Sequence, residues 1–405
     1  LGDVYKRQAP HCDDRLTEGT ELKALNTNPD ELSLTYFFPT GQTDHIWSDE
    51  AARTTPTLSK QVFLDMARSA EETGFDALFI ADSWSGHQRA AERAGHQSPK
   101  FHAPLLAMGL FAVTDHIGVI TTLHTTHHKP AHAARMGATL DAFSGGRWGW
   151  NVVTGFGDPE ARLFGDENLV EHDRRYAMAG EFVEVVKRLW ADEEAVDFEG
   201  DYYRVDGRIK APRPLQRPHP LLVSAGGSPA GMAFAARHCD QLVVAGNSLD
   251  KVRETGHRVE SVLESVGRAA PLGTTPFAIV IVREEEGEAE ETYERLTRSL
   301  NEDATMELAA DILGGIDSVR ALFEEQGSEA AARAWGSGQG ILKIFGTSEQ
   351  VARQLIALKQ HTATSNVLVN FPLWNPAEVR AFAPVLDHLR EEGIWSPPSE
   401  RNYSW

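Results

Sequence analysis

Strand-like and helix-like segments alternate along almost the whole chain, and this alternation is the feature that most limits its fold. Short apolar runs typical of buried strands are each followed by apolar residues at helical spacing, as in Gln61–Thr73, where Gly74 suits the helix end. Such alternation predicts a parallel sheet with crossover helices, and eight strand–helix units close into a barrel. The predicted strands are 32–38, 75–81, 117–123, 148–154, 221–225, 240–245, 275–282 and 366–371.

One segment interrupts the alternation. Residues from about 283 to 345 are acidic and helix-rich, end in the glycine-rich run Gly336–Gly340, and are too long for a simple strand-to-helix connection. The segment is either a solvated decoration or an active-site lid with a glycine hinge, and its place before the last strand favours the lid. We expect a single (β/α)8 TIM-barrel domain over residues 31–405 with this insertion. Residues 1–30 are expected to be an N-terminal extension, disordered or partly an artefact.

Charge and cysteine content narrow the possible partners. The chain carries 39 Lys and Arg against 59 Asp and Glu, a formal net charge of −20 at pH 7. This charge repels nucleic acid and anionic membranes, so an anionic ligand would need a local pocket of arginines and backbone amides. Cys12 and Cys239 are too few for a disulfide framework. No apolar run approaches the ~18 residues of a membrane span, and no signal-peptide core is evident, so we expect a cytoplasmic protein.

Polar side chains follow several predicted strands, at the end of a barrel where active sites are built. Asp82 follows the second strand, Thr122 and His124 end the third, and Asn151 lies in the fourth. Glu160 comes in the loop after the fourth strand. Because these ends meet at one face of a parallel barrel, the sequence predicts a polar site there.

A second group of residues is suited to an anion. In the run Gly227–Pro229, glycine permits close backbone approach, Ser228 can cap the next helix, and proline fits its first turn. The free amides of that helix start can hold a phosphate. His172 and Tyr176, four residues apart, share one helix face, and Arg175 adds positive charge. The alternative is an ordinary helix cap with solvated arginines.

The histidine-rich run after the third strand raises the possibility of a metal site. His124 and His127, with Asp82 and Glu160 from other strand ends, are possible ligands of a metal-dependent hydrolase. The ligand spacing is unspecific, however, and no HExxH or HxxEH motif accompanies it. We therefore expect no metal. No Gly-x-Gly-x-x-Gly follows a strand, which argues against a Rossmann domain.

Six runs together carry a resemblance to a known family. They are Thr139–Arg147, Asn151–Gly155, Glu171–Tyr176, Phe198–Tyr203, Pro212–Pro220 and Gly226–Ser228. In this order they resemble the bacterial-luciferase-like flavin monooxygenases, and most closely the branch that uses reduced FMN. That branch includes monooxygenases of alkanesulfonates, dimethylsulfone, nitrilotriacetate, dibenzothiophene sulfone and pyrimidines. The resemblance covers residues 32–282 strongly and 341–390 weakly.

The resemblance implies a role for each matching position. Asp82 and Glu160 match positions near the flavin ring system. Thr122 and Asn151 match a pair that lines the flavin face where oxygen binds. The positions that match contacts to the ribityl chain and phosphate are His172, Arg175, Tyr176 and Ser228, in agreement with the anion site at Gly227 and Ser228.

The resemblance further implies an oxygenase that takes reduced FMN (FMNH2) from a separate NAD(P)H:flavin reductase and uses O2 as co-substrate. One oxygen atom would enter a small organic substrate, such as a sulfone or a heterocyclic amide, through a peroxide of the flavin. Thr122 and Asn151 are the predicted catalytic pair, and His124 is the predicted proton-transfer residue because an unperturbed histidine titrates near neutral pH. A homodimer or homotetramer is expected.

Two departures from the family pattern concern the substrate. His124, His127 and His128 replace smaller or aromatic residues of several relatives, and Phe371–Trp374 is apolar where a sulfonate-binding pattern is arginine-rich. An alkanesulfonate is therefore not expected. Three alternatives remain open: a deazaflavin (F420)-dependent oxidoreductase on the same barrel, the metal-dependent hydrolase, and an inactive flavin-binding barrel.

Overall fold

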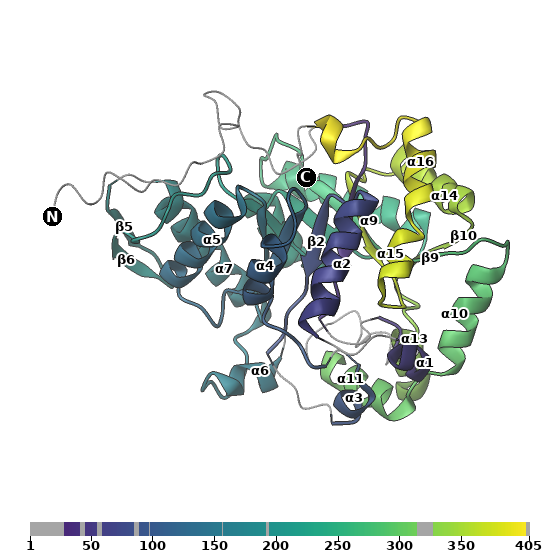
Figure 1. Cartoon of the computed structure of the whole chain (residues 1–405). Helices are drawn as coiled ribbons and strands as arrows, with labels where there is room; N and C mark the ends of the chain where they lie inside the picture. Colours follow the sequence, from purple (N-terminus) through teal and green to yellow (C-terminus); the bar gives the residue numbers. More distant parts are fainter. Residues whose placement is uncertain are drawn as a thin grey trace.

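In a computed structural model of the chain, parallel strands close into a barrel surrounded by helices (Figure 1). The structure describes residues 28–40, 45–54, 59–84, 89–96, 98–155, 157–191, 194–313 and 327–401. Most of the predicted N-terminal extension, residues 1–27, lies outside these ranges. The barrel strands pair in the order β1, β2, β3, β4, β7, β8, β9, β11 and back to β1, which confirms the predicted (β/α)8 fold.

All eight predicted strands are present in the barrel. A separate two-stranded antiparallel hairpin, β5 and β6, follows the long helix α7 and precedes β7. The strands are β1 (Ser33–Phe37), β2 (Ala77–Ile80), β3 (Gly118–His124), β4 (Trp148–Val153), β5 (Val196–Glu199), β6 (Arg204–Gly207), β7 (Leu221–Ser224), β8 (Gln241–Val244), β9 (Gly273–Val282), β10 (Leu342–Gly346) and β11 (Asn366–Asn370).

Strand β9 is longer than its neighbours and pairs with three strands. Residues 273–276 pair with β8, residues 278–282 pair with β10, and β11 pairs with the middle of β9. Two residues of β9, Ala278 and Ile279, pair with β11 on one edge and with β10 on the other. Strand β10 therefore pairs with the same edge of β9 as β8 does, but beyond the point where β8 ends. The segment 283–345 therefore contributes an additional parallel strand at the carboxyl end of the barrel, which the sequence pattern did not indicate.

Helices cover the outside of the barrel, and a smaller group gathers at one end. In Figure 1, α1, α3, α11 and α13 lie together at the end where α6 also lies, and α6 follows the carboxyl end of β4. The helices are α1 (Asp49–Thr54), α2 (Lys60–Thr73), α3 (Arg89–Ala94), α4 (Ala103–Phe111), α5 (Pro130–Ser144), α6 (Asp158–Leu163), α7 (His172–Ala191), α8 (Pro229–His238), α9 (Leu249–Ser265), α10 (Glu288–Arg298), α11 (Glu302–Leu313), α13 (Ser328–Gly336), α14 (Ser348–His361), α15 (Pro376–Arg380), α16 (Ala383–Glu391) and a 3-10 turn, η1 (Pro398–Arg401).

The glycine turn between α5 and β4 has a structural role. Gly145 ends α5 in the left-handed conformation at φ 74°, which favours glycine. Arg147 then donates hydrogen bonds from its guanidinium to the carbonyl oxygens of Phe111, Thr114 and Ile117. The half-buried Arg147 therefore joins the amino end of β4 to the loop before β3, far from the polar strand ends.

The barrel interior is layered. Inward-facing positions alternate along each strand. Near the amino ends, four buried polar side chains form one layer: Thr35, Gln241, Thr275 and Asn366. An apolar layer follows: Phe37, Ala77, Phe79, Ile120, Leu221, Val223, Leu368, with Ala81, Val243 and Phe277 packed against it. At the carboxyl end the interior becomes polar again, at Thr122, Asn151 and Asn370.

Candidate active site

Thr122 and Asn151 lie side by side at the carboxyl ends of β3 and β4. They are register partners, both are buried, and the Asn151 Nδ2 amide donates to Thr122 Oγ1 at 3.0 Å. Thr122 Oγ1 in turn donates to the carbonyl oxygen of Ile80 at 2.9 Å. Because the Thr122 proton is committed to Ile80, its oxygen can only accept, and this fixes the orientation of the Asn151 amide. Asn151 Oδ1 is left buried with no hydrogen-bond partner among the described residues.

Asp82, after β2, holds the following loop in place. Its two carboxylate oxygens each accept a backbone N–H at 2.9 Å, from Ser83 and from Ala103 at the start of α4. Burial raises the pKa of Asp82, and the Ala103 hydrogen bond and the nearby His102 and Lys100 oppose this shift. The carboxylate therefore fixes the backbone beside the strand ends, and its predicted contact with a flavin ring stays a prediction.

Glu160 links three segments at the carboxyl end. Its side chain is almost fully buried in α6, and Oε1 accepts the backbone N–H of Trp84 at 3.0 Å. Two histidines face the same carboxylate, one at the end of β3 and one in the loop after it: His124 Nε2 lies 3.5 Å from Oε1, and His127 Nε2 lies 3.2 Å from Oε2. Glu160 thus ties the β2 loop, the β3 loop and α6 together.

The reason for assigning proton transfer to His124 does not hold in this environment. Burial lowers the pKa of His124 to about 4, although the Glu160 carboxylate opposes the shift. His124 is therefore neutral at neutral pH, where an unperturbed histidine would be partly charged. As a neutral imidazole it keeps one donor and one acceptor nitrogen. Its role in proton transfer remains a prediction, but with a neutral ring.

Ser228 begins α8 after β7, as the sequence predicts. Its hydroxyl accepts the N–H of Gly231 at 3.1 Å, and His172 Nε2 lies 3.2 Å from the same oxygen. A Cβ at Gly226 would come within 2.4 Å of the Tyr176 hydroxyl, whereas a Cβ at Gly227 would meet nothing within 4 Å. The backbone is therefore tightly packed at Gly226 but open at Gly227, directly before the start of α8. Open backbone at a helix N-terminus is typical of an anion site.

Arg175 and Tyr176 bring the start of α7 against this anion site. Arg175 is buried, donates from Nη1 to the Val170 carbonyl at 3.0 Å, and has no described hydrogen-bond partner at Nε. Burial raises the pKa of Tyr176, opposed by the Arg175 charge and by hydrogen bonds with Ser228 and Thr154. A buried arginine with an unused donor beside open backbone fits a phosphate group.

The structure thus places the predicted site residues in two groups. The first surrounds the ends of β2, β3 and β4: Asp82, Thr122, His124, Asn151 and Glu160. The second surrounds the start of α8: His172, Arg175, Tyr176, Gly227 and Ser228. Among the described residues, no group of three or more His, Cys, Asp or Glu side chains is arranged to hold a metal ion.

Several residues at this end were given no role from the sequence. Trp84, His102, Thr126 and Phe164 contribute buried polar atoms or ring contacts beside Glu160 and His127. Asn370, at the end of β11, is buried with no described partner for Oδ1. Asn370 could have been predicted from the sequence, because it lies at the end of a predicted strand and on the same face as Leu368. The other four lie in loops or at helix ends, where no periodic pattern marks them.

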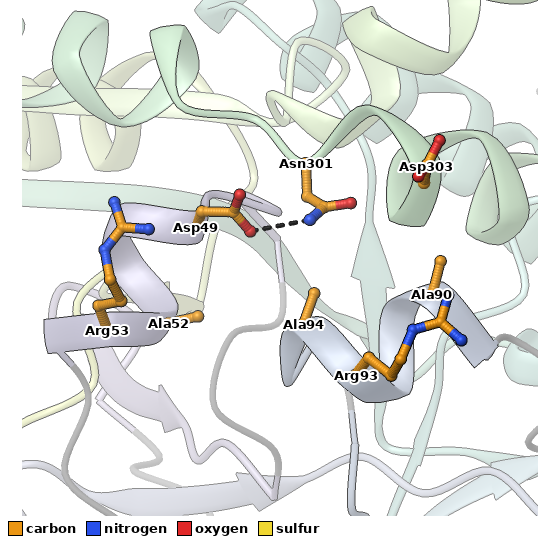
Figure 2. Close-up of a pocket in the computed structure, with 8 residues that line it drawn as sticks. All are labelled: Asp49, Ala52, Arg53, Ala90, Arg93, Ala94, Asn301 and Asp303. Atoms are coloured by element: carbon orange, nitrogen blue, oxygen red, sulfur yellow. Dashed lines mark hydrogen bonds between the residues drawn. The ribbon is translucent and has the colours of Figure 1, made fainter.

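A separate cavity of about 450 Å³ lies among α1, α3 and α11. Figure 2 shows Asp49 and Asn301 joined by a hydrogen bond there, at 2.9 Å, with Arg53 and Arg93 beside them. The lining residues are Asp49, Ala52, Arg53, Ala90, Arg93, Ala94, Asn301 and Asp303. None of the predicted site residues lines this cavity, so it is distinct from both groups.

The sequence profile described as luciferase-like monooxygenase matches residues 36–365, most of the chain. The chain belongs to this family. The matched span includes every predicted site residue, so the groups at the strand ends and at the start of α8 both lie within the family domain. The expectation drawn from the six sequence runs is confirmed at this level.

Three relatives illustrate the range of the family. Component A of nitrilotriacetate monooxygenase from Aminobacter aminovorans is 31% identical over 301 residues, 67% of this chain and 66% of the relative. Dibenzothiophene-sulfone monooxygenase from Rhodococcus erythropolis is 28% identical over 93% of this chain and 96% of the relative. The FMNH2-dependent dimethylsulfone monooxygenase of Pseudomonas putida is 29% identical over 73% and 78%. The chain is thus similar to flavin-dependent monooxygenases with unlike substrates.

Solved structures agree on the fold. A riboflavin lyase crystallised with modified FMN and riboflavin superposes with a TM-score of 0.81 at 24% identity, covering 91% of this chain and 93% of the other. At this identity the likeness shows the barrel architecture alone. In the described part of the chain, no helix combines the length and apolar character needed to cross a membrane.

Proposed function

We propose that the protein is the oxygenase component of a two-component system. It would bind reduced FMN from a separate NAD(P)H:flavin reductase and, with O2, insert one oxygen atom into a small organic substrate while the second leaves as water. The cofactor, when bound, supplies the two electrons and activates the oxygen. The observation that carries the proposal is the pairing, in one barrel end, of an anion site with the Thr122–Asn151 pair.

The anion site would hold the phosphate and ribityl chain of the cofactor. The Ser228 hydroxyl and the free N–H groups at the start of α8 would donate hydrogen bonds to the phosphate, and Arg175 would supply the charge that the acidic chain otherwise lacks. His172 and Tyr176 border the same space. These residues would bind FMN without a nucleotide-binding motif for NAD(P)H. This agrees with a flavin that is reduced by NAD(P)H on a separate reductase.

The Thr122–Asn151 pair would face the reactive part of the flavin. Asn151 Oδ1 is an acceptor held in one direction with no described donor. A reduced flavin carries ring N–H groups that an oxidised flavin lacks, so this acceptor favours the reduced form. Asp82 and Glu160 would hold the surrounding loops, and His124 would offer a neutral imidazole for moving a proton.

The test is a fluorescence titration of the purified protein with oxidised and with reduced FMN under argon. Reduced FMN should bind at least tenfold more tightly, and product should form only when a flavin reductase and O2 are both present. Equal affinity for the two forms, or rapid NADH oxidation without a reductase, would contradict the proposal. A hydride-transferring F420 enzyme would turn over without consuming O2, so oxygen uptake separates the two chemistries.

We also propose that two copies of the chain associate through α4 and α5. Helix α4 has no polar side chain in the sequence APLLAMGLF, yet Leu105 is 73% exposed, and Phe143 at the end of α5 is 59% exposed. A helix that is apolar on all sides is normally covered. Helices α4 and α5 contact one another, so both exposed side chains belong to neighbouring helices on the outside of the barrel. Leu105→Lys should yield a monomer in light scattering, whereas an unchanged oligomer would exclude this face.

A further inference from the structure

Four side chains beside Glu160 carry buried polar atoms without a partner. Trp84 Nε1, His102 Nδ1, Thr126 Oγ1 and His127 Nδ1 have no hydrogen-bond partner among the described residues, whereas His127 Nε2 lies 3.2 Å from Glu160 Oε2. Native proteins contain few such atoms, and several together mark a place where a ligand or ordered water completes the bonding. We call these four residues and Phe164 the Trp84 cluster.

The cluster is compact and mostly aromatic. The Trp84 ring lies 5.1 Å from His102 and 5.3 Å from Phe164, edge to face in both cases. The His127 ring stacks on Phe164 at 4.0 Å with 9° between the planes. Thr126 Oγ1 lies 3.0 Å from the position of a Cβ on Gly155, so little space is left on that side. Flat surfaces with a few polar atoms are typical of sites for small aromatic molecules.

The cluster reaches the protein surface at Phe164. Phe164 is 43% exposed, and its neighbour Leu163, at the end of α6, is 58% exposed. Both follow Glu160 on the segment that Glu160 fixes to the β2 and β3 loops. Solvent-facing apolar groups next to unpartnered buried polar atoms fit an entrance for a molecule that is itself partly apolar.

The charges around the cluster oppose a polyanionic ligand. Two carboxylates, Asp82 and Glu160, lie at its inner side, and Lys100 is the cation that acts on Asp82. The charge of the buried Arg175 is offset by the Glu171, Asp158 and Glu160 carboxylates. A di- or tricarboxylate would meet like charge without a matching set of arginines, which disfavours it.

We propose that the Trp84 cluster is the substrate subsite, and that its substrate is an uncharged aromatic molecule carrying a hydrogen-bond-accepting oxygen, either sulfonyl or carbonyl. The indole N–H of Trp84 can only donate, so its partner must be an acceptor. The rings of Trp84, His127 and Phe164 supply the stacking surfaces. This inference rests on the proposed function, because it assigns the substrate of that oxygenase.

Four probes test the substrate class by calorimetric titration of the full chain, with and without FMN. Dibenzothiophene sulfone and fluorenone carry a sulfonyl and a carbonyl oxygen on similar flat frames, dibenzothiophene carries neither, and nitrilotriacetate is a polyanion. One or both oxygenated probes should bind at least tenfold more tightly than dibenzothiophene, and the tighter of the two identifies the acceptor. Nitrilotriacetate should not bind. Equal affinity for dibenzothiophene and its oxygenated analogues, or tighter binding of nitrilotriacetate, would overturn the proposal.

A substitution locates the site. Trp84→Phe keeps an aromatic ring but removes the indole N–H and part of the ring surface, so the oxygenated probe should lose about fivefold more affinity than dibenzothiophene does. Trp395→Phe is the matched control, because Trp395 is also buried with an unpartnered Nε1 but packs near Gly74 and Leu386, away from the strand ends. Equal effects of both variants, or a loss of FMN affinity in Trp84→Phe with probe binding unchanged, would overturn the assignment.

Failure of the two proposals can be told apart. If the probes bind as expected but reduced FMN does not bind the wild-type chain, the oxygenase proposal fails and the subsite stands as a ligand site. If reduced FMN binds and oxygen is consumed but no oxygenated probe binds, the oxygenase proposal stands and the substrate class is wrong.

Discussion

The two polar layers inside the barrel contain the same kinds of side chain but differ in how they are bonded. Near the amino ends, Asn366 Nδ2 donates to Thr35 at 3.0 Å and to Gln241 Oε1 at 3.4 Å, and Thr275 donates to the same Gln241 oxygen at 3.4 Å. At the carboxyl ends, Asn151 and Asn370 each keep an acceptor oxygen with no described donor. Both layers are buried.

This difference separates a structural role from a functional one. Burying an amide without its hydrogen bonds costs roughly 1–3 kcal/mol per unmade group. Unpartnered groups add nothing to the stability of a fold, so the amino-end layer serves stability, and the carboxyl-end layer is where we propose that a ligand binds. Four predictions test this comparison, from the largest expected effect to the smallest.

Asn151→Ala should lower the rate of product formation by about 100-fold or more, as expected when a preorganised group at a reacting centre is removed. Thermal stability should fall less than in the amino-end layer, because the substitution removes one hydrogen bond, to Thr122, together with an acceptor that has no described partner. Steady-state turnover with a flavin reductase and a melting curve measure both quantities. Unchanged turnover would remove Asn151 from the mechanism.

Asn366→Ala, the matched substitution at the amino end, should do the reverse. It leaves Thr35 without its hydrogen-bond partner and removes one of the two donors to Gln241 Oε1, at a cost of about 1–3 kcal/mol, and so should lower the melting temperature by several degrees. Reduced-FMN affinity should stay within twofold of wild type. A variant as stable as wild type would show that the layers do not differ in this way.

Ser228→Ala should weaken reduced-FMN binding by about tenfold, because the hydroxyl borders the anion site. It should also cost about 1 kcal/mol of stability, since Ser228 caps α8. Ser248→Ala removes a matched cap from α9 and serves as the control, with the stability loss alone expected. Equal FMN affinity in the two variants would argue against the anion site.

The smallest expected effect concerns the pH dependence of stability. The unfolded chain takes up a proton on His124 near pH 6.5, but the folded chain does so only near pH 4, because burial lowers the pKa. Folding is therefore disfavoured as the pH falls from 6.5 to 4, and His124 adds no pH dependence above that window. His124→Gln should reduce the fall in melting temperature between pH 7 and pH 4.5. Exposed His361→Gln is the control, and identical curves for the two variants would contradict the assignment.

The fold was predictable because its signals are local and repeated. Apolar strands, helical spacing and glycine helix ends such as Gly74 and Gly145 each depend on neighbours within a few residues. The Ser228 cap was predictable for the same reason, since serine before proline acts on the next turn. Strand β10 was not, because its place depends on β9 separating from β8, which no local pattern records.

The candidate site was predictable only in part. Strand-end residues such as Thr122 and Asn151 follow from the barrel itself, because parallel strands end at one face. The sharing of Glu160 by His124 and His127 does not follow, since it needs α6 to fold back over two loops. The low pKa of His124 likewise depends on burial by distant segments, so the reason first given for its role was wrong.

The sequence by itself determined the barrel, the order of its strands and which residues end them, because side-chain periodicity and turn chemistry act over short distances. Only the tertiary structure decided which buried polar groups are bonded and which are left for a ligand. Hydrogen bonding and desolvation depend on atoms brought together from far along the chain, and identical side chains such as Asn366 and Asn151 differ only in those surroundings.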